Sequence, residues 1–248
     1  MSDQYGADVV AIYDQSFTLV PLRQYVELPS VYQILGDVTG LSVLDLACGT
    51  GYYAKELRRR GATRVMGVDL SEDMIRATRS REEAERLGVE YMVGDAGALE
   101  HLGDFDIVTG IHLLHYASSL EHLKGMCKSI SRNLNSDGCF IGYQLNYDLS
   151  RKPHYYDKYC FNVRISEDAS DGDPLTFSVT LGDNTSPEVT AYYWGKESLE
   201  SALQGAGLAE IRWVVPTPSL EGVEKHGTDL WADVMRKPFE LIVTCRKA

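Results

Sequence analysis

The chain has 248 residues, of which 44% are hydrophobic and 24% charged, and its formal net charge is −12. This length can bury the core of one large domain, and the acidic balance argues against nucleic acid, because proteins that bind phosphate backbones usually present a basic face. The N-terminus lacks the pattern of a signal peptide, no apolar run is long enough to span a membrane, and the five cysteines form no Cys-x-x-Cys pair. These features predict a cytoplasmic protein with no membrane partner.

Two short helices are expected first, because residues 5–36 have helical spacing that is interrupted at Pro21 and Pro29. Apolar runs then predict strands at 41–47, 63–69, 89–95, 105–111 and 139–145. Helices are expected between them at 51–60, 71–88 and 118–134. Near-continuous apolar strands that alternate with helices are typical of a parallel sheet covered on both faces. The predicted fold class is therefore α/β, with a doubly wound, mostly parallel sheet.

The pattern changes after residue 150. Segments 159–165, 175–181 and 189–194 alternate like antiparallel strands between turn-rich stretches, which predicts an inserted β cap. A helix at 196–206, a strand at 209–215, a loop or short helix at 220–236 and a final strand at 239–245 follow. We expect a single domain with four parts, namely a helical lid (1–38), a cofactor-binding core (39–147), a substrate cap (151–194) and the rest of the core (195–248).

The stretch "VLDLACGTGYYAKEL" (43–57) places a glycine turn directly after the first strand of the predicted sheet. Its Gly49-x-Gly51-x-x-Ala54 pattern fits the fingerprint of a dinucleotide site, but Asp45 just before the turn would repel a pyrophosphate. Asp69 and Asp95 end the next two strands, at the sheet edge where ligands of such folds bind. Three acids there suit S-adenosylmethionine, which carries a cationic amino group, a ribose diol and an adenine amine. NAD remains the alternative.

The sequence resembles the class I S-adenosylmethionine-dependent methyltransferases. "VLDLACGTGYYAKEL" is similar to their glycine-rich motif, "VMGVDLSEDMI" to their acidic ribose motif, "VGDAGAL" to their adenine motif, and "FDIVTGIHLLHYA" to the segment after their fourth strand. The resemblance implies a Rossmann-like, seven-stranded sheet whose last strand is inserted antiparallel. Over most of its length the chain also looks similar to small natural-product methyltransferases, typified by the toxoflavin-pathway N-methyltransferase, although His115 stands where Asn is expected.

The resemblance implies a set of cofactor-binding residues, in which Asp69 would hold the ribose, Asp95 the adenine amine, and the N-terminal segment the methionine carboxylate. These residues are Tyr5, Arg23, Asp45, Ala47, Gly49, Gly51, Asp69, Leu70, Met74, Asp95, Ala96 and Ile111. His112 is the candidate catalytic base, because a histidine near the methyl group could accept a proton. Aromatic and histidine side chains predict a pocket for a planar substrate, namely Tyr13, His115, Tyr116, Tyr143, Tyr193 and Trp231. No metal site is expected.

The sequence thus predicts an enzyme that transfers a methyl group from S-adenosylmethionine to a nitrogen or oxygen of a small aromatic or heterocyclic molecule, in secondary metabolism, by in-line displacement. A monomer or homodimer is expected. The alternatives are a nucleic-acid or protein methyltransferase and a non-catalytic S-adenosylmethionine-binding subunit. The fourth strand ends in "VTGIHLLH", without the Asn/Asp-Pro-Pro-aromatic motif used on exocyclic amines of nucleic acids.

Overall fold

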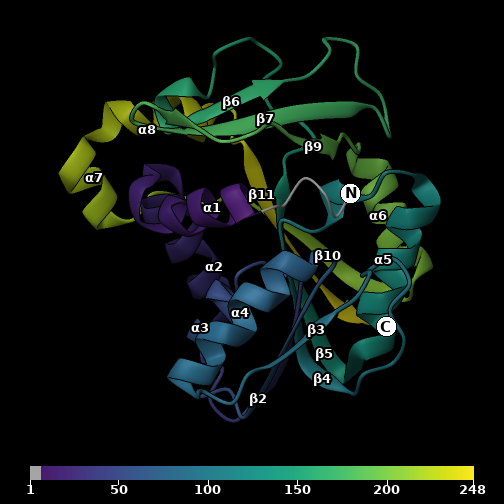
Figure 1. Cartoon of the computed structure of the whole chain (residues 1–248). Coiled ribbons are helices and arrows are strands. Elements are labelled where there is room, and N and C mark those ends of the chain that lie inside the picture. Colours follow the sequence, from purple (N-terminus) through teal and green to yellow (C-terminus); the bar gives the residue numbers. More distant parts are fainter. Residues whose placement is uncertain (1–6) are drawn as a thin grey trace.

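The computed structural model describes residues 7–248, and its centre is a seven-stranded sheet with strand order β10-β11-β5-β4-β1-β2-β3 (Figure 1). Strand β11 pairs antiparallel with both β10 and β5, whereas the other strand pairs of this described sheet are parallel. The strands are β1 (Ser42–Leu46), β2 (Arg64–Asp69), β3 (Glu90–Val93), β4 (Phe105–Ile111), β5 (Leu134–Leu145), β10 (Leu208–Val214) and β11 (Glu240–Lys247). The predicted Rossmann-like α/β fold is confirmed, including the inserted last strand.

Helices cover both faces of this sheet, as the apolar strands predict. The helices are α3 (Tyr52–Arg59), α4 (Glu72–Glu85), α5 (Leu120–Asn133) and α6 (Lys196–Gly205). Val43 belongs to the core cluster with α3 and α4, whereas its neighbour Leu44 belongs to the cluster with α5 and α6. Successive side chains of a strand point to opposite faces, so one apolar run contributes to both cores.

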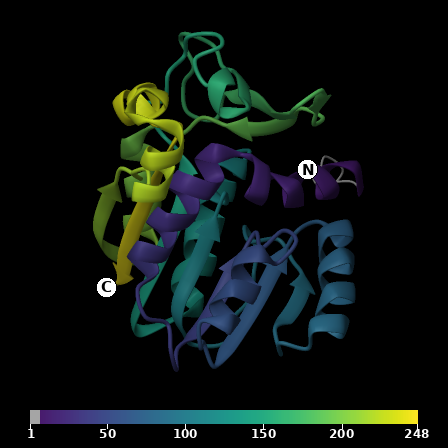
Figure 2. The same ribbon diagram turned by 90° about the vertical axis from the view of Figure 1, so that its left-hand side faces the viewer.

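The N-terminal segment is α1 (Ala7–Leu19), a π-helix η2 (Arg23–Glu27) and α2 (Leu28–Leu35). Pro29 has no N–H to donate to the carbonyl of Tyr25, four residues earlier in the chain. That carbonyl instead accepts a hydrogen bond from the N–H of Ser219, at 2.7 Å. The proline therefore does not separate two helices as expected. It lies just after a π turn, a feature common at functional sites. Figure 2 shows α1 crossing between the central sheet and the cap above it.

The predicted cap is a separate antiparallel sheet in which β7 pairs with β6 along one edge and with β8 and β9 along the other. Its strands are β6 (Phe161–Arg164), β7 (Pro174–Leu181), β8 (Asn184–Thr185) and β9 (Val189–Tyr192), and the short helices η3 (Leu114–Tyr116) and η4 (Asp157–Tyr159) lie before it in the chain. The segment at 220–236, expected as a loop or a short helix, forms two helices, α7 (Leu220–His226) and α8 (Thr228–Arg236). Trp231 of α8 packs in one core cluster with Tyr159 of the cap region.

Strand β5 begins at Leu134, five residues before the predicted start. The register between β4 and β5 shifts between the Phe105–Leu134 and Ile107–Cys139 pairs, so the turn-like "NSDG" forms an irregularity within the strand. None of the helices in the described part of the chain combines the length and the apolar character needed to cross a bilayer.

Candidate functional site

A pocket opens at the carboxyl ends of β1, β2, β3 and β4, where the strand order of the sheet reverses. Parallel sheets bind their ligands at this switch point. The pocket is lined by eight of the predicted cofactor-binding residues, namely Ala47, Gly49, Asp69, Leu70, Met74, Asp95, Ala96 and Ile111. Tyr13, His112 and Tyr116 line it as well. We call it the cofactor pocket.

Asp69 connects the end of β2 to the glycine turn. Its two carboxylate oxygens accept the backbone N–H groups of Gly49 and Ser71, each at 2.8 Å. Burial raises the pKa of Asp69, and these two hydrogen bonds oppose that rise. Its carboxylate is thus held in place on the pocket wall, where it could also accept hydrogen bonds from a ribose diol.

The turn itself depends on glycine at two positions. Gly49 has φ +53°, and a Cβ there would lie 3.2 Å from the ring of Tyr13. Gly51 has φ +73°, and a Cβ there would lie 2.6 Å from the hydroxyl of Tyr91. Gly51 does not line the cofactor pocket but is the N-cap residue directly before α3, so its role is to shape the turn.

Asp45 lies behind the turn and does not line the pocket. One of its oxygens accepts the Thr109 hydroxyl at 2.7 Å, and the other, Oδ2, has no hydrogen-bond partner among the described residues. Burial, together with the nearby Asp69, raises the pKa of Asp45 to about 7, while the bond from Thr109 opposes the rise. The group can therefore change its charge near neutral pH.

Asp95 follows β3 and is paired with a residue that the sequence analysis missed. Its Oδ1 accepts the backbone N–H of Gly97 at 2.7 Å and lies 3.2 Å from Nε2 of His122. His122 and Met126 line the pocket from one face of α5, four residues apart. That spacing was visible in the sequence, but which helix faces the strand ends was not. The other missed lining residues are Val68, Ser71, Gly94 and Leu113.

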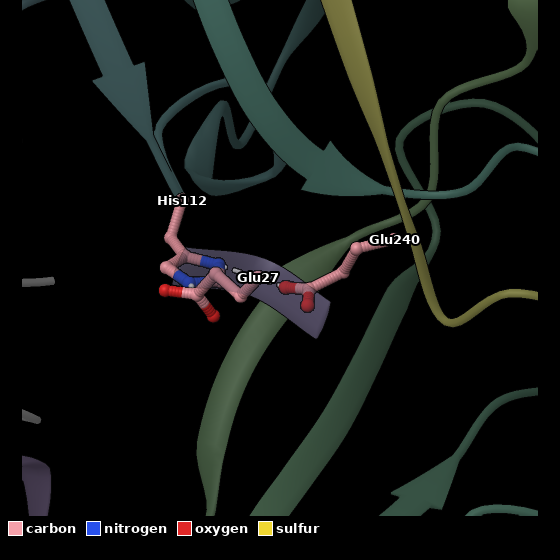
Figure 3. Close-up of side chains that lie close together, drawn as sticks. All are labelled: Glu27, His112 and Glu240. Atoms are coloured by element: carbon pink, nitrogen blue, oxygen red, sulfur yellow. Dashed lines mark hydrogen bonds and ion pairs between the residues drawn. The ribbon is translucent and has the colours of Figure 1, made fainter. Parts of the chain in front are cut away.

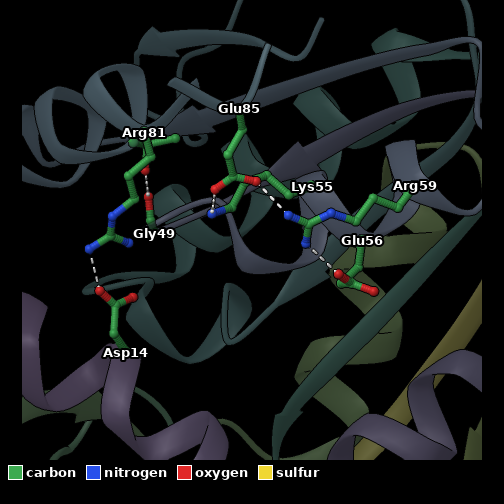
Figure 4. Close-up of polar contacts among 8 residues, drawn as sticks. Asp14, Gly49, Lys55, Glu56, Arg59, Arg81 and Glu85 are labelled. Atoms are coloured by element: carbon green, nitrogen blue, oxygen red, sulfur yellow. Dashed lines mark hydrogen bonds and ion pairs between the residues drawn. The ribbon is translucent and has the colours of Figure 1, made fainter. Parts of the chain in front are cut away.

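An ion pair joins the N-terminal helix α1 to helix α4 beside the pocket. Asp14 on α1 pairs with Arg81 on α4, as Figure 4 shows. On the same side of the sheet, Glu85 of α4 binds Lys55 and Arg59 of α3. Two of the basic side chains of α3, Lys55 and Arg59, are thus paired with acids.

Arg23 lies away from the predicted position at the cofactor. It lines a second pocket and stacks over the rings of Tyr13 and Phe17, at 4.6 and 4.5 Å from their centroids. Its Nε is 3.7 Å from Glu27 Oε2. Tyr5, another predicted cofactor residue, lies outside the described residues.

The second pocket lies between the lid, the cap and the ends of β4 and β11, and we call it the acceptor pocket. Its walls are mainly apolar side chains from α1, the cap and the start of β11, namely Ile12, Phe161, Phe177, Val179, Val189 and Phe239. Its polar members are Tyr13, Ser16, Arg23, His112, Tyr116, Ser186 and Glu240. Tyr13, His112 and Tyr116 line both pockets, so the two cavities meet at these side chains.

His112 lies at this junction between two buried carboxylates (Figure 3). Its Nε2 is 3.2 Å from Glu27 Oε2, and its Nδ1 is 2.8 Å from Glu240 Oε1. Tyr53 donates to the other oxygen of Glu27 at 2.8 Å. The sequence analysis missed both glutamates. A signal existed, since each interrupts an apolar segment, but their partner is far away in the chain.

The remaining predicted substrate residues do not line the two main pockets. His115 and Tyr193 line a separate small pocket, and burial lowers the pKa of His115 well below its usual value. Tyr143 is buried beneath His112, with ring centroids 5.5 Å apart. Trp231 is buried in the core cluster below the cap and donates to the carbonyl of Gly222 at 3.1 Å.

The sequence around this site is similar to known methyltransferases. The model of a methyltransferase domain family matches residues 43–138, which hold the glycine turn and the three acids. A demethylmenaquinone methyltransferase of Lactococcus lactis is 35% identical over 103 residues, 39% of this chain and 40% of that protein. A ubiquinone biosynthesis O-methyltransferase of Acinetobacter baumannii is 28% identical over 204 residues, 73% of this chain and 84% of that protein.

Solved structures of methyltransferases have the same fold as this chain. A crystal structure of an S-adenosylmethionine-dependent methyltransferase from Mesorhizobium loti superposes with a TM-score of 0.64 at 22% identity, covering 89% of this chain and 97% of that one. Against four of the curated relatives, the chain spans only about half of their length, from 40% to 51%. The chain therefore has the fold of S-adenosylmethionine-dependent methyltransferases, and its residues 43–138 are similar to a methyltransferase domain.

Proposed function

We propose that this chain is an S-adenosylmethionine-dependent methyltransferase that modifies a nitrogen or oxygen of a small aromatic or heterocyclic molecule. The observation that carries the proposal is the junction of two pockets at Tyr13, His112 and Tyr116. One pocket has the acids that suit the cofactor, and the other has the apolar walls that suit a planar acceptor. A non-catalytic cofactor-binding subunit would have no need of the second pocket.

The residues of the cofactor pocket fit S-adenosylmethionine by their chemistry. Asp69 and Asp95 are hydrogen-bond acceptors at the ends of neighbouring strands, suited to the ribose diol and the adenine amine. Leu70 and Met74 offer apolar surface for the adenine ring. The glycine turn lets the backbone approach the ligand closely. We assign the amino-acid end of the cofactor to the side of the turn and of buried Asp45.

The bound cofactor supplies an activated methyl group, so the protein chiefly has to position the acceptor and exclude water. The lid and cap enclose the acceptor pocket, and Tyr13 and Tyr116 stand at the opening between the pockets. Holding two reactants in line can supply about 7–11 kcal/mol of the barrier reduction. His112, the catalytic residue that the sequence suggests, lies at the same opening.

The narrower parts of the proposal rest on the sequence. The acidic net charge and the cysteine pattern favour a cytoplasmic enzyme that acts on a small molecule rather than on nucleic acid. Similarity to small natural-product methyltransferases favours secondary metabolism. We also retain the division into lid, core and cap, and a monomer or homodimer.

The test combines ligand titration with a search for the product. Calorimetric titration with S-adenosylhomocysteine and with NAD is expected to show binding of the first alone. Incubation with S-adenosylmethionine and a panel of aromatic hydroxyl, amine and ring-nitrogen compounds is expected to add 14 Da, the mass of one CH2 unit, to at least one of them. Tight NAD binding without homocysteine binding would overturn the proposal. Methylation of RNA or protein alone would favour the alternatives.

A further inference from the structure

Both ring nitrogens of His112 face carboxylates. Glu27 lies 3.2 Å from Nε2 and Glu240 lies 2.8 Å from Nδ1. An ionised carboxylate only accepts hydrogen bonds, so each nitrogen that binds one must carry a hydrogen. With hydrogens on both nitrogens the ring is an imidazolium, and it has no lone pair with which to take a further proton.

The backbone holds His112 in this arrangement. Its φ is +60°, in the left-handed region that non-glycine residues rarely adopt, and its N–H donates to the carbonyl of Tyr143 at 2.7 Å. The two carboxylates raise the pKa of His112 to about 9 against the opposing effect of burial. Arg23 and His112 lower the pKa of Glu27 to about 2, although burial alone would raise it. The ring and Glu27 are thus charged at neutral pH.

The two carboxylates differ in what else they face. Glu27 lies on the lid side of the ring, is bonded by Tyr53 and lies beside Arg23, and it lines neither pocket. Glu240 begins β11 and lines the acceptor pocket together with Phe161 and Phe177 of the cap. Glu240 is therefore the carboxylate that an acceptor in this pocket can touch.

We propose that Glu240, rather than His112, receives the proton of the acceptor, and that the acceptor carries a proton-bearing nitrogen or oxygen on an apolar ring. This inference rests on the proposed methyltransferase function. The nucleophilic atom forms a bond to the methyl carbon, the carbon–sulfur bond breaks with its electron pair left on sulfur, and the nucleophile's proton passes to a Glu240 oxygen. His112 is a positioning residue that orients Glu240 through Nδ1–H.

The same three residues could also hold a divalent cation, because their ligand atoms lie within 4.8 Å of one another. The position of Arg23 argues for the imidazolium instead. Its guanidinium lies 3.7 Å from Glu27 and adds a positive charge beside the cluster. Arg23, Glu27, His112 and Glu240 together are neutral only when His112 is protonated, and buried charges need such compensation. A metal ion would leave the cluster with excess positive charge.

The first test needs no acceptor. The 15N resonances of His112, assigned with the H112Q variant in the 248-residue chain with and without S-adenosylhomocysteine, should show both nitrogens protonated at pH 7.5. Added Zn2+ at equimolar concentration should leave these resonances unchanged. A neutral His112 at this pH would overturn the proposal, and so would a Zn2+-induced shift of His112 that E240Q abolishes.

The second test compares E240Q with E27Q, the same change on the other side of the ring. The acceptors are one found in the panel and an electron-poor analogue whose nucleophilic atom has already lost its proton at the assay pH. E240Q should lower kcat for the first acceptor by about 100- to 10,000-fold, the usual contribution of a general base, and for the analogue by much less. The E27Q defect should be the same for both acceptors.

Equal E240Q defects with both acceptors would overturn the role of Glu240, since loss of packing does not depend on acceptor acidity. S-adenosylhomocysteine affinity should be unchanged in E240Q, as a check that the fold and cofactor pocket are intact. If the wild-type chain neither binds S-adenosylhomocysteine nor methylates any acceptor, the proposed function itself fails, and the His112 resonances still decide the state of the cluster.

Discussion

The two pockets that meet at His112 are built in opposite ways. The cofactor pocket comes mainly from the ends of β1 to β4, whose order along the chain places one acid or turn after another on a common edge. The acceptor pocket takes Arg23 from the lid, Phe177 from the cap and Glu240 from the last strand of the sheet. A repeating topology builds the first, whereas contacts between distant segments build the second.

This difference has a functional consequence. Parallel βαβ units bring successive strand ends together by the rules of chain connection, so their ligand site follows from the fold. The lid and cap pack together in a core cluster of their own, which holds Val26 of the lid, Phe161 of the cap, and Phe239 beside them. Changes in the cap should therefore alter acceptor choice while leaving cofactor binding unchanged.

The largest effect is expected for Asp69→Ala. Hydrogen bonds to a charged group contribute about 1.5–3 kcal/mol each, so the loss of two from a ribose diol should weaken S-adenosylhomocysteine binding about 100- to 20,000-fold. Isothermal titration measures this. Asp73→Ala removes an exposed acid from the first turn of α4 and serves as the control. Unchanged affinity in Asp69→Ala would show that the ribose assignment is wrong.

A smaller and opposite pattern is expected for Phe177→Ala in the cap. Removal of an aromatic side chain from an apolar pocket should raise KM for the acceptor about tenfold or more, because apolar contact area is lost. Affinity for S-adenosylhomocysteine should stay the same. Thr176→Ala, next to it on β7 but outside the acceptor pocket, is the matched variant. If Phe177→Ala weakened cofactor binding instead, the two pockets would not be separable.

Cofactor affinity should depend on pH through Asp45. Its pKa is raised to about 7, so the buried carboxyl is neutral below that pH and ionised above it. A cationic amino group near the turn favours the ionised form, so S-adenosylhomocysteine should bind about tenfold more tightly at pH 8 than at pH 6. Titrations over this range check the sign. Asp45→Asn should remove the dependence, and a wild-type affinity independent of pH would contradict the assignment.

The smallest effect is expected at the lid contact between Asp14 and Arg81. Both side chains are about one-third exposed, so their ion pair should contribute only about 0.2–1 kcal/mol. Arg81→Ala should speed the release of S-adenosylhomocysteine by about fivefold at most, measured by stopped-flow fluorescence. Arg76→Ala, on the exposed side of α4, provides the comparison. A much larger effect would make the lid a principal determinant of cofactor binding.

The order of the elements in the core could be predicted because local patterns determine it. Apolar runs marked the strands, and Ser71 followed by Glu72 and Asp73 marked the start of α4. The prediction was wrong at Pro29, which lies in the first turn of α2 directly after a π turn and does not interrupt the helical segment, and it was incomplete at 220–236, where two helices form rather than a loop or one short helix. In both places, contacts with distant segments outweigh the local signal, as with Ser219 bonding to Tyr25.

The sequence by itself determined the α/β sheet, the glycine turn and the acids at the strand ends, since each depends on residues close together in the chain. The tertiary structure decided which side chains share the acceptor pocket, and it put Trp231 and Tyr143 into cores rather than at that pocket. It also joined Glu27 and Glu240, 213 positions apart by their numbers, through one histidine. No local pattern encodes such a pairing, because it depends on how the lid and the final strand pack together.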